Sequence, residues 1–364
     1  MQSRTDSPSA HPPASRRPDF DISAVAVHGE RLPVRESVVF ETPFARLLHF
    51  ARPGAEGLSP LILVAPLSSN FAYVLRDAVL GLLPHANVHV LEWRDGRDVP
   101  AESGRFGLDE NIDGVIQAVK ALPPGAHVLG LCQSVVPCLA AAALLEQADD
   151  AARPASLILM GGPVDPRIRP TRVAQLIRAQ SLDVLAACAT TPVPAAWAGA
   201  GRRVYSSEAQ RPGLMAHLAR HMATGGELQR KTLHDDGADP LRHPFLKHYL
   251  ALMDLPAEVF LDTMRLVFFE AALPQKQLRW RGVRVEGDAL ERTALLTVEG
   301  EEDDIAAVGQ TAAAHDVARR LPAGRRARHV EPGVGHFGVF HGAAWRNHIV
   351  PVLNRFIADH AAPA

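Results

Sequence analysis

The chain has 364 residues, of which 47% are hydrophobic and 21% charged, a composition typical of a globular protein. Its formal net charge of −2 provides no general attraction to nucleic acid, and no apolar stretch is long enough to span a bilayer, so neither is an expected partner. Three cysteines are too few for a disulfide scaffold and suit a reducing cytoplasm.

The first 18 residues, MQSRTDSPSAHPPASRRP, are rich in Ser, Pro and Arg and contain no apolar run. Because a signal peptide needs an apolar segment, this stretch instead predicts a disordered tail over residues 1–18. The remaining length, residues 19–364, suits one large α/β domain that carries an insertion.

Apolar runs bounded by turn residues predict eight strands, and helical segments separate them from residue 60 onward. Alternating strands and helices form parallel sheets, whereas the first two strands are joined too tightly for a helical crossover and should pair antiparallel. This is the plan of the α/β-hydrolase fold, an eight-stranded, mostly parallel sheet with helices on both faces. The predicted strands are 33–39, 45–50, 60–65, 87–93, 126–131, 155–160, 294–299 and 326–331, and the predicted helices are 71–83, 109–121, 134–147, 308–321 and 344–360.

The interval from about 165 to 291 interrupts this alternation, since it is helix-rich and carries many prolines. It lies between the sixth and seventh predicted strands, which is the usual place for a cap over the catalytic turn of this fold. We therefore predict a helical cap insertion over about 165–291 within the catalytic domain.

The run HVLGLCQSVVP at 127–137 places Cys132 where an apolar strand ends and a helix begins. α/β-hydrolases present their nucleophile on such a turn, held above the sheet. Gly130 stands two residues before it, as the pattern requires, while Ser134 replaces the usual second glycine. Unpaired backbone N–H groups and the helix dipole stabilise a thiolate at this place. A lone cysteine is more often a small buried apolar residue, so the assignment depends on the partners of Cys132.

Nucleophilic catalysis needs a base and an acid that orients the base, and in this fold they follow the nucleophile in the order acid, then His. Asp303 and Asp304 follow the predicted strand 294–299, and we prefer Asp303 as the acid with Asp304 as the alternative. His336 lies on a glycine-rich loop after the last strand. Among 17 histidines it alone has both a suitable loop and a suitable place in the order.

An oxyanion hole needs a backbone N–H from the loop after the first parallel strand, here APLSSN at 65–70. Leu67 or Ser68 can donate there, together with the N–H of Gln133. An ordinary strand-to-helix turn would occupy the same position. Position alone therefore favours neither an oxyanion-hole loop nor an ordinary turn.

Two further patterns carry no prediction. GVGHFG at 333–338 matches a dinucleotide-binding pattern, but too few residues follow it to complete a βαβ unit with its acidic residue. His217 and His221 have the i, i+4 spacing of metal ligands but lack the glutamate of a zinc protease helix. We expect them on an exposed helical face and predict no metal site.

Several long runs resemble the intracellular short-chain polyhydroxyalkanoate (polyhydroxybutyrate, PHB) depolymerases, from about Arg17 to the C-terminus. The resemblance implies a cytoplasmic enzyme, associated with storage granules, with Cys132 as nucleophile, Asp303 as acid and His336 as base. The runs are RPDFDI at 17–22, EWRDGRDVP at 92–100, GRFGLDENID at 104–113, HVLGLCQSVVP at 127–137, LMGGPVDPRIRPTRV at 159–173, HYLALMDLPAEVFLDTMRLVF at 248–268, LLTVEGEEDDIAAVGQT at 295–311 and PGVGHFGVF at 332–340.

The resemblance further implies that ester bonds of the polymer are cleaved through a covalent thioester. No resident cofactor is implied, although coenzyme A can replace water as the acyl acceptor. A polyhydroxyalkanoate synthase shares the Cys–Asp–His arrangement and is one alternative. A catalytically silent granule-binding protein on the same fold is the other, because PLSSNF at 66–71 differs from the family's Gly- and His-containing loop.

Overall fold

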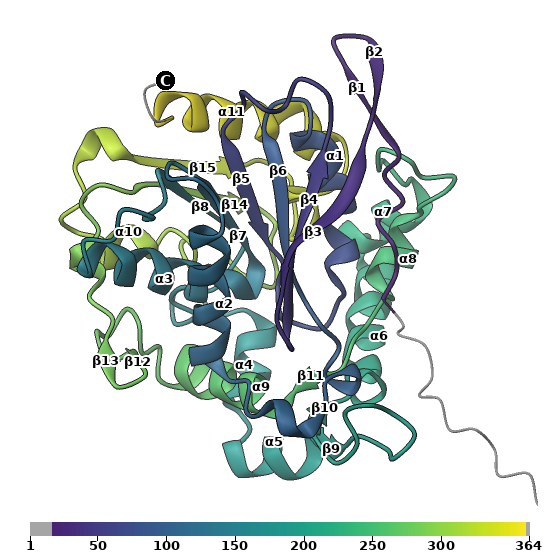
Figure 1. Ribbon diagram of the computed structural model, residues 1–364. Helices are drawn as coiled ribbons and strands as arrows, with labels where there is room; N and C mark the ends of the chain where they lie inside the picture. The colour runs from purple at the N-terminus through teal and green to yellow at the C-terminus, as the bar shows by residue number, and fades with distance from the viewer. Residues whose placement is uncertain (1–16, 362–364) are drawn as a thin grey trace, which may run out of the picture.

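The computed structural model describes residues 17–361, and its central feature is one sheet of eight strands (Figure 1). In spatial order the strands are β15 (Arg326–Glu331), β14 (Ala294–Gly300), β8 (Ser156–Met160), β7 (His127–Leu131), β5 (Pro60–Val64), β6 (Asn87–Trp93), β4 (Ala45–Ala51) and β3 (Arg35–Glu41). Neighbours from β15 to β6 are parallel, whereas β4 pairs antiparallel with β6 and with β3. The predicted α/β-hydrolase plan is therefore confirmed.

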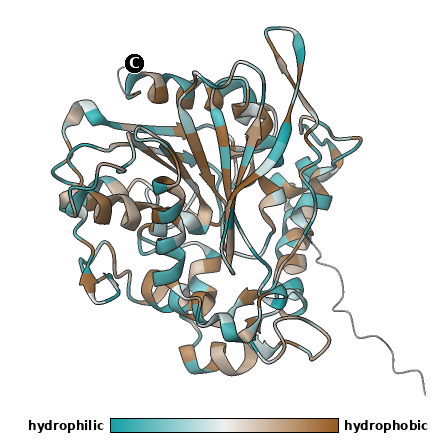
Figure 2. Ribbon diagram, in the orientation of Figure 1, coloured by the Kyte–Doolittle hydropathy of each residue, from teal (hydrophilic) through white to brown (hydrophobic). Residues whose placement is uncertain are grey.

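The central strands are buried on both faces, and their sequences explain why. PLILV in β5, HVLGL in β7 and SLILM in β8 are nearly continuous apolar runs in which almost every residue is buried. Such runs are typical of parallel strands that have helices on both faces, because neither face meets water. Figure 2 shows the corresponding hydrophobic colour along the middle of the sheet.

Four main helices cover the sheet: α1 (Arg76–Leu82), α2 (Leu108–Lys120), α3 (Val135–Gln147) and α11 (Val350–Asp359). In Figure 1, α2 and α3 cross in front of the sheet, with α1 and α11 on its other face. The turn η9 (Trp345–Ile349) precedes α11 and packs on α1, where the buried indole of Trp345 donates to the carbonyl of Asp77 at 3.2 Å.

The helix predicted over 308–321 is wrong for most of its length, since only α10 (Ala314–Val317) forms there. The carboxylate of Glu299 accepts hydrogen bonds from the backbone N–H groups of Gly309, Thr311 and Ala312, and Gly309 has a φ of +101°. The buried Glu299 side chain thus binds backbone N–H groups that a helix would have used and holds the segment in turns. Local helical propensity does not indicate this contact.

At the N-terminal end, most of the predicted tail falls on residues 1–16, which lie outside the described residues. Arg17 is described, and its guanidinium pairs with Glu92 of β6 at 2.9 Å. A hairpin of β1 (Ala24–Val27) and β2 (Glu30–Pro33), which we did not predict, follows before β3.

Between β8 and β14 the chain leaves the sheet and forms a largely helical cap, seen at the lower and right sides of Figure 1. Its helices α4, α5 and α6 each begin after a hydroxyl residue, Thr171, Ser181 or Ser206, whose side chain accepts a backbone N–H of the first turn. The cap elements are α4 (Arg172–Arg178), α5 (Leu182–Ala189), β9 (Thr190–Pro192), β10 (Arg203–Tyr205), α6 (Ser207–Thr224), α7 (Glu227–Leu233), α8 (Phe245–Tyr249), β11 (Leu255–Pro256), α9 (Ala257–Thr263), η5 (Met264–Phe269), β12 (Arg279–Trp280), β13 (Val283–Arg284) and η6 (Gly287–Ala289).

The remaining helical turns are short: η1 (Ala72–Leu75), η2 (Gly96–Asp98), η3 (Ala101–Ser103), η4 (Cys132–Ser134), η7 (Ala323–Arg325) and η8 (Phe337–Val339). Among the described residues, no helix combines the length and the apolar character that crossing a membrane requires.

Candidate active site

Cys132 occupies a strained turn directly after β7, with a φ of +51° that side-chain-bearing residues rarely adopt. The turn is possible because two neighbours are glycines. A Cβ on Gly130 would lie 2.9 Å from Sγ of Cys138, and a Cβ on Gly162 would collide with the carbonyl oxygen of Cys132. This backbone is the strand-to-helix elbow on which α/β-hydrolases carry their nucleophile. Our sequence analysis missed Gly162, although a Gly-Gly pair directly after a strand signals close backbone approach.

His336 and Asp303, far apart in the sequence from Cys132, meet at this elbow. Asp303 follows β14, and His336 lies just before η8 on the loop after β15. Nδ1 of His336 is 2.9 Å from Oδ2 of Asp303, whose Oδ1 accepts the backbone N–H groups of Ile305 and Ala306 at 2.8 Å each. The carboxylate is thereby held in one orientation and fixes the imidazole proton on Nδ1.

The electrostatics of His336 depend on its two partners. Burial disfavours the charged imidazole, but this is outweighed by the charges of Asp303 and Cys132 and by hydrogen bonds with both side chains. The pKa of His336 is therefore raised well above its ordinary value. An imidazole of this kind can hold a proton beside a thiolate and later deliver it.

Asp304, the alternative acid, points away from His336. Its Oδ2 accepts from Nη2 of Arg220 at 2.6 Å and lies 3.1 Å from Nε2 of His221, both on α6. The structure therefore places Asp303 against the imidazole and uses Asp304 to fasten the cap.

Ser134, the only hydroxyl residue in the elbow run, is turned into the core. It is 2% exposed, its Oγ accepts the N–H of Leu131 at 2.7 Å, and it donates to the carbonyl of Val64 at 3.0 Å. These bonds tie the elbow to the adjacent strand β5 and leave the serine with a structural role.

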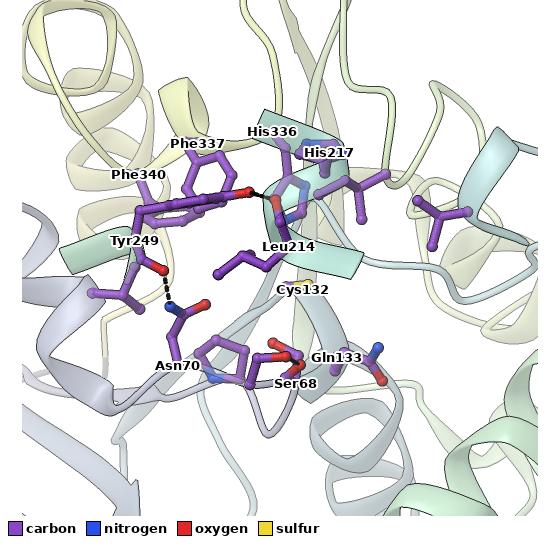
Figure 3. Close-up of a pocket in the computed structure, with 15 residues that line it drawn as sticks. Ser68, Asn70, Cys132, Gln133, Leu214, His217, Tyr249, His336, Phe337 and Phe340 are labelled. Atoms are coloured by element: carbon purple, nitrogen blue, oxygen red, sulfur yellow. Dashed lines mark hydrogen bonds between the residues drawn. The ribbon is translucent and has the colours of Figure 1, made fainter. Parts of the chain in front are cut away.

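A cavity of about 220 Å³ opens above Cys132. Figure 3 shows the sulfur of Cys132 between His336 on one side and Ser68 and Gln133 on the other. Ser68 and Gln133 both line this cavity, whereas Leu67 is buried and does not, so of the predicted oxyanion donors these two have the better position. The lining residues are mostly apolar: Pro66, Ser68, Ser69, Asn70, Val74, Cys132, Gln133, Val173, Leu214, His217, Tyr249, Ile305, His336, Phe337 and Phe340.

The loop that carries Ser68 is fixed to the cap. Nδ2 of Asn70 donates to the carbonyl of Tyr249 at 2.8 Å, as Figure 3 shows, and the N–H of Met253 donates to the carbonyl of Ser69 at 2.8 Å. The position of the candidate oxyanion donor therefore depends on the cap segment after α8. Asn70 did not stand out in the sequence, because its partners lie far away along the chain.

Glu227, at the start of α7, is a third residue that sequence analysis missed. Its carboxylate accepts the backbone N–H groups of Phe337 at 3.0 Å and Gly338 at 2.6 Å, directly after His336. Burial raises the pKa of Glu227 despite the charge of Lys231 and these two hydrogen bonds. Within the sequence, Glu227 looks like an ordinary acidic residue of a first helical turn.

The prediction that His217 and His221 form an exposed helical face is wrong. His221 is buried, His217 lines the cavity, and both have a ligand atom within 4.8 Å of one on Asp304. However, Nη2 of Arg220 donates both to Asp304 at 2.6 Å and to Nδ1 of His217 at 3.1 Å. Because a guanidinium is always positively charged, this cluster is already arranged around a cation and does not fit a metal ion in this form.

Residues 161–361, more than half of the chain, match the family model described as the C-terminus of PHB de-polymerase. The matched part contains Asp303 and His336 and begins after Cys132. No match was found among curated proteins.

Two solved structures share the fold at low sequence identity. Naproxen esterase (carboxylesterase NP) from Bacillus subtilis is 14% identical over 88% of this chain and 92% of its own, with a TM-score of 0.50. A membrane phospholipase A described as a bacterial virulence factor is 15% identical over 90% and 86%, with a TM-score of 0.50. With the fold and the family match together, the chain belongs to the PHB de-polymerase family of ester hydrolases.

Proposed function

We propose that this protein is an intracellular polyhydroxybutyrate depolymerase that cleaves the polymer of cytoplasmic granules through Cys132, His336 and Asp303. The observation that carries the proposal is one continuous contact series at the base of an apolar cavity. The carboxylate of Asp303 is 2.9 Å from the imidazole of His336, whose pKa is raised in turn by its interaction with the side chain of Cys132. Family membership supports the substrate class.

In the first half of the reaction, His336 takes the thiol proton of Cys132, and Sγ then attacks the carbonyl carbon of an ester in the polymer. The backbone N–H groups of Ser68 (or Leu67) and Gln133 stabilise the oxygen that becomes negative. When the carbonyl reforms, the bond to the alcohol oxygen breaks, and that oxygen takes a proton from His336. The products are a shortened chain with a free hydroxyl and a thioester on Cys132.

In the second half, water attacks the thioester while His336 accepts one of its protons. The carbon–sulfur bond breaks, a hydroxybutyrate-bearing acid leaves, and the thiolate and imidazolium are restored. If the thiol of coenzyme A attacks in place of water, the same intermediate gives a hydroxybutyryl thioester. The largely apolar lining of the cavity, both aliphatic and aromatic, suits the short methyl-bearing repeat of this polyester.

The test is release of 3-hydroxybutyrate products from amorphous granules by the wild type and by Cys132→Ala. We expect Cys132→Ala to lose turnover by about 10³-fold or more. Cys188→Ala is the matched control, because Cys188 is an exposed free thiol on α5 and should be dispensable. Wild-type turnover in Cys132→Ala would remove the mechanism.

Further arms of this experiment separate the alternatives. Product analysis with and without coenzyme A distinguishes thiolysis from hydrolysis. Growth of polymer from hydroxybutyryl-coenzyme A would favour the synthase. Intact granule binding without any acylation of Cys132 by a thiol-directed ester probe would favour the silent binding protein.

A further inference from the structure

We propose that His217 is a substrate-binding residue whose Nε2–H donates a hydrogen bond to a second ester carbonyl, next to the one that Cys132 attacks. The inference rests on the proposed function, since it assigns a polyester chain to this cavity. It goes further by giving the site a residue that recognises more than a single ester bond.

The hydrogen bond with Arg220 sets the tautomer of His217. Nη2 of Arg220 lies 3.1 Å from Nδ1 of His217, and a guanidinium can only donate. Nδ1 must therefore offer its lone pair. A neutral imidazole with an accepting Nδ1 carries its proton on Nε2, so His217 presents an N–H donor at that atom.

The surroundings keep this ring neutral. Burial lowers the pKa of His217 to about 4, and the positive charges of His221, Arg220 and His336 act in the same direction against the attraction of Asp304. At neutral pH the ring of His217 is consequently uncharged, with Nε2 as its N–H donor and Nδ1 as its acceptor.

The ring of His217 borders the site, and its Nε2 has no hydrogen-bond partner among the described residues. His217 lines the same cavity as Cys132 and His336, and Figure 3 shows it at the His336 side of the cavity. Among the described residues, the only hydrogen bond that the side chain of His217 makes is the one from Arg220 to Nδ1. Nε2 is thus available to a molecule in the cavity.

The position of the donor is fixed relative to the catalytic residues. Arg220 is held by Asp304 at 2.6 Å, and the same carboxylate oxygen lies 3.1 Å from Nε2 of His221. Asp304 directly follows Asp303, which orients His336. The donor on α6 is therefore linked through Arg220 to the loop that carries the catalytic acid, and their spacing does not depend on a flexible side chain alone.

A polyester is a ligand of the right chemistry for such a donor. Each repeat offers carbonyl acceptors and no donors, so binding groups in the protein must donate. Close to His217 the cavity is lined by apolar side chains, including Leu214 and Ile305, which contact the aliphatic part but cannot recognise a carbonyl. A substrate with two ester bonds should use His217, whereas a simple monoester should not.

The test measures binding separately from chemistry, in the Cys132→Ala background. We expect His217→Leu to weaken the Kd for the methyl ester of a hydroxybutyrate dimer, measured by calorimetry, by about 5- to 10-fold, with little change for methyl 3-hydroxybutyrate. His217→Gln should restore most of the binding, since an amide can accept from Arg220 and still donate. His234→Leu, an exposed cap histidine outside this cavity, is the matched control.

Equal weakening for both esters, no weakening for either, or failure of His217→Gln to restore binding would overturn the inference. A loss of dimer binding in the parent protein after treatment with EDTA would also overturn it, because a metal would then be the binding group. Failure of the proposed function has a different result, namely wild-type turnover in Cys132→Ala with His217 intact.

Discussion

The carboxylate of Glu227 accepts the backbone N–H of Phe337 at 3.0 Å, and through this bond a cap helix supports the loop that carries His336. The second oxygen accepts the N–H of Gly338 at 2.6 Å, so both oxygens are used by consecutive residues. Two bonds to neighbouring N–H groups fix a loop in both position and direction. The cap therefore takes part in placing the imidazole as well as in covering the cavity.

Glu227→Gln is predicted to lower kcat with little change in KM. Glutamine keeps one acceptor, but its NH₂ group must face a backbone N–H, so one hydrogen bond is lost and two donors oppose each other. We expect a stability loss of about 1–3 kcal/mol and a fall in kcat of about 10-fold or more. Steady-state kinetics with a small activated ester and thermal unfolding measure the two effects.

The matched control for that variant is Glu302→Gln. The side chain of Glu302 is exposed and pairs with Arg230, whereas only its backbone N–H, which the substitution keeps, bonds to the loop of His336, at the carbonyl of Val334. It should leave kcat unchanged. Equal kinetics for Glu227→Gln and Glu302→Gln would show that the loop holds its position without Glu227.

Substitutions of the adjacent residues Asp303 and Asp304 should have clearly different effects on activity. In Asp303→Asn the amide can still cap Ile305 and Ala306 through its oxygen, but its NH₂ group faces Nδ1–H of His336 and favours the wrong tautomer. We expect kcat to fall by about 10²- to 10⁴-fold with the fold intact. Asp304→Asn should instead retain most activity on a monoester.

For Asp304→Asn the expected change is in stability, of about 1 kcal/mol, because its bonds with Arg220 and His221 fasten α6. Chemical denaturation measures this loss and monoester kinetics measures the activity. A larger activity loss in Asp304→Asn than in Asp303→Asn would reverse the assignment of the acid.

The close approach of Gly162 to the elbow makes a third prediction. An added Cβ would collide with the carbonyl oxygen of Cys132 and would also lie 2.5 Å from Cγ1 of Val135, so the backbone must move. We expect Gly162→Ala to reduce kcat/KM by about 10²-fold or more, since small displacements of reacting atoms are costly. Gly324→Ala, where a Cβ meets nothing within 4 Å, is the control for the same substitution.

The outcome for these two glycine variants is read from kcat/KM together with circular dichroism. Retained activity in Gly162→Ala would mean that the elbow adjusts without displacing the sulfur. A comparable loss in Gly324→Ala would mean that the assay reports general instability.

How much of this arrangement the sequence could predict depends on the range of the interactions. The strands of the sheet were predictable, because a run such as SLILM in β8 is apolar throughout and bounded by turn residues. The order nucleophile, acid, histidine was also readable, since it depends on topology. By contrast, the segment after Gly309 lacks the predicted helix because a buried Glu299 binds its backbone, a contact that no local pattern reports.

The cap side of the site was the least predictable for the same reason. Glu227 and Asn70 contribute through hydrogen bonds to Phe337 and Tyr249, which are 110 and 179 positions away in the sequence, and His217 contributes by lining the same cavity as Cys132. The exposed position predicted for His217 is wrong, because a polar residue with the spacing of an amphipathic helix usually faces solvent. The tertiary position of α6, which brings His217 into the lining of the cavity, cannot be read from the local sequence.

The raised pKa of His336 gives a final prediction with a defined sign. Burial alone lowers this pKa, and the charges of Asp303 and Cys132 more than reverse that effect. Because the folded protein holds this proton more tightly than the unfolded chain, the contribution of His336 to stability is complete below the unfolded value of about 6.5 and is lost as pH rises through the raised pKa.

Asp303→Asn removes one charge, so His336 should titrate at lower pH and stability should fall less steeply on the alkaline side. Histidine NMR, assigned with His336→Gln, and unfolding measured across pH test this, with Asp304→Asn as the neighbouring control that leaves the titration of His336 nearly unchanged. An unchanged or higher pKa in Asp303→Asn would mean that Asp303 does not stabilise the imidazolium.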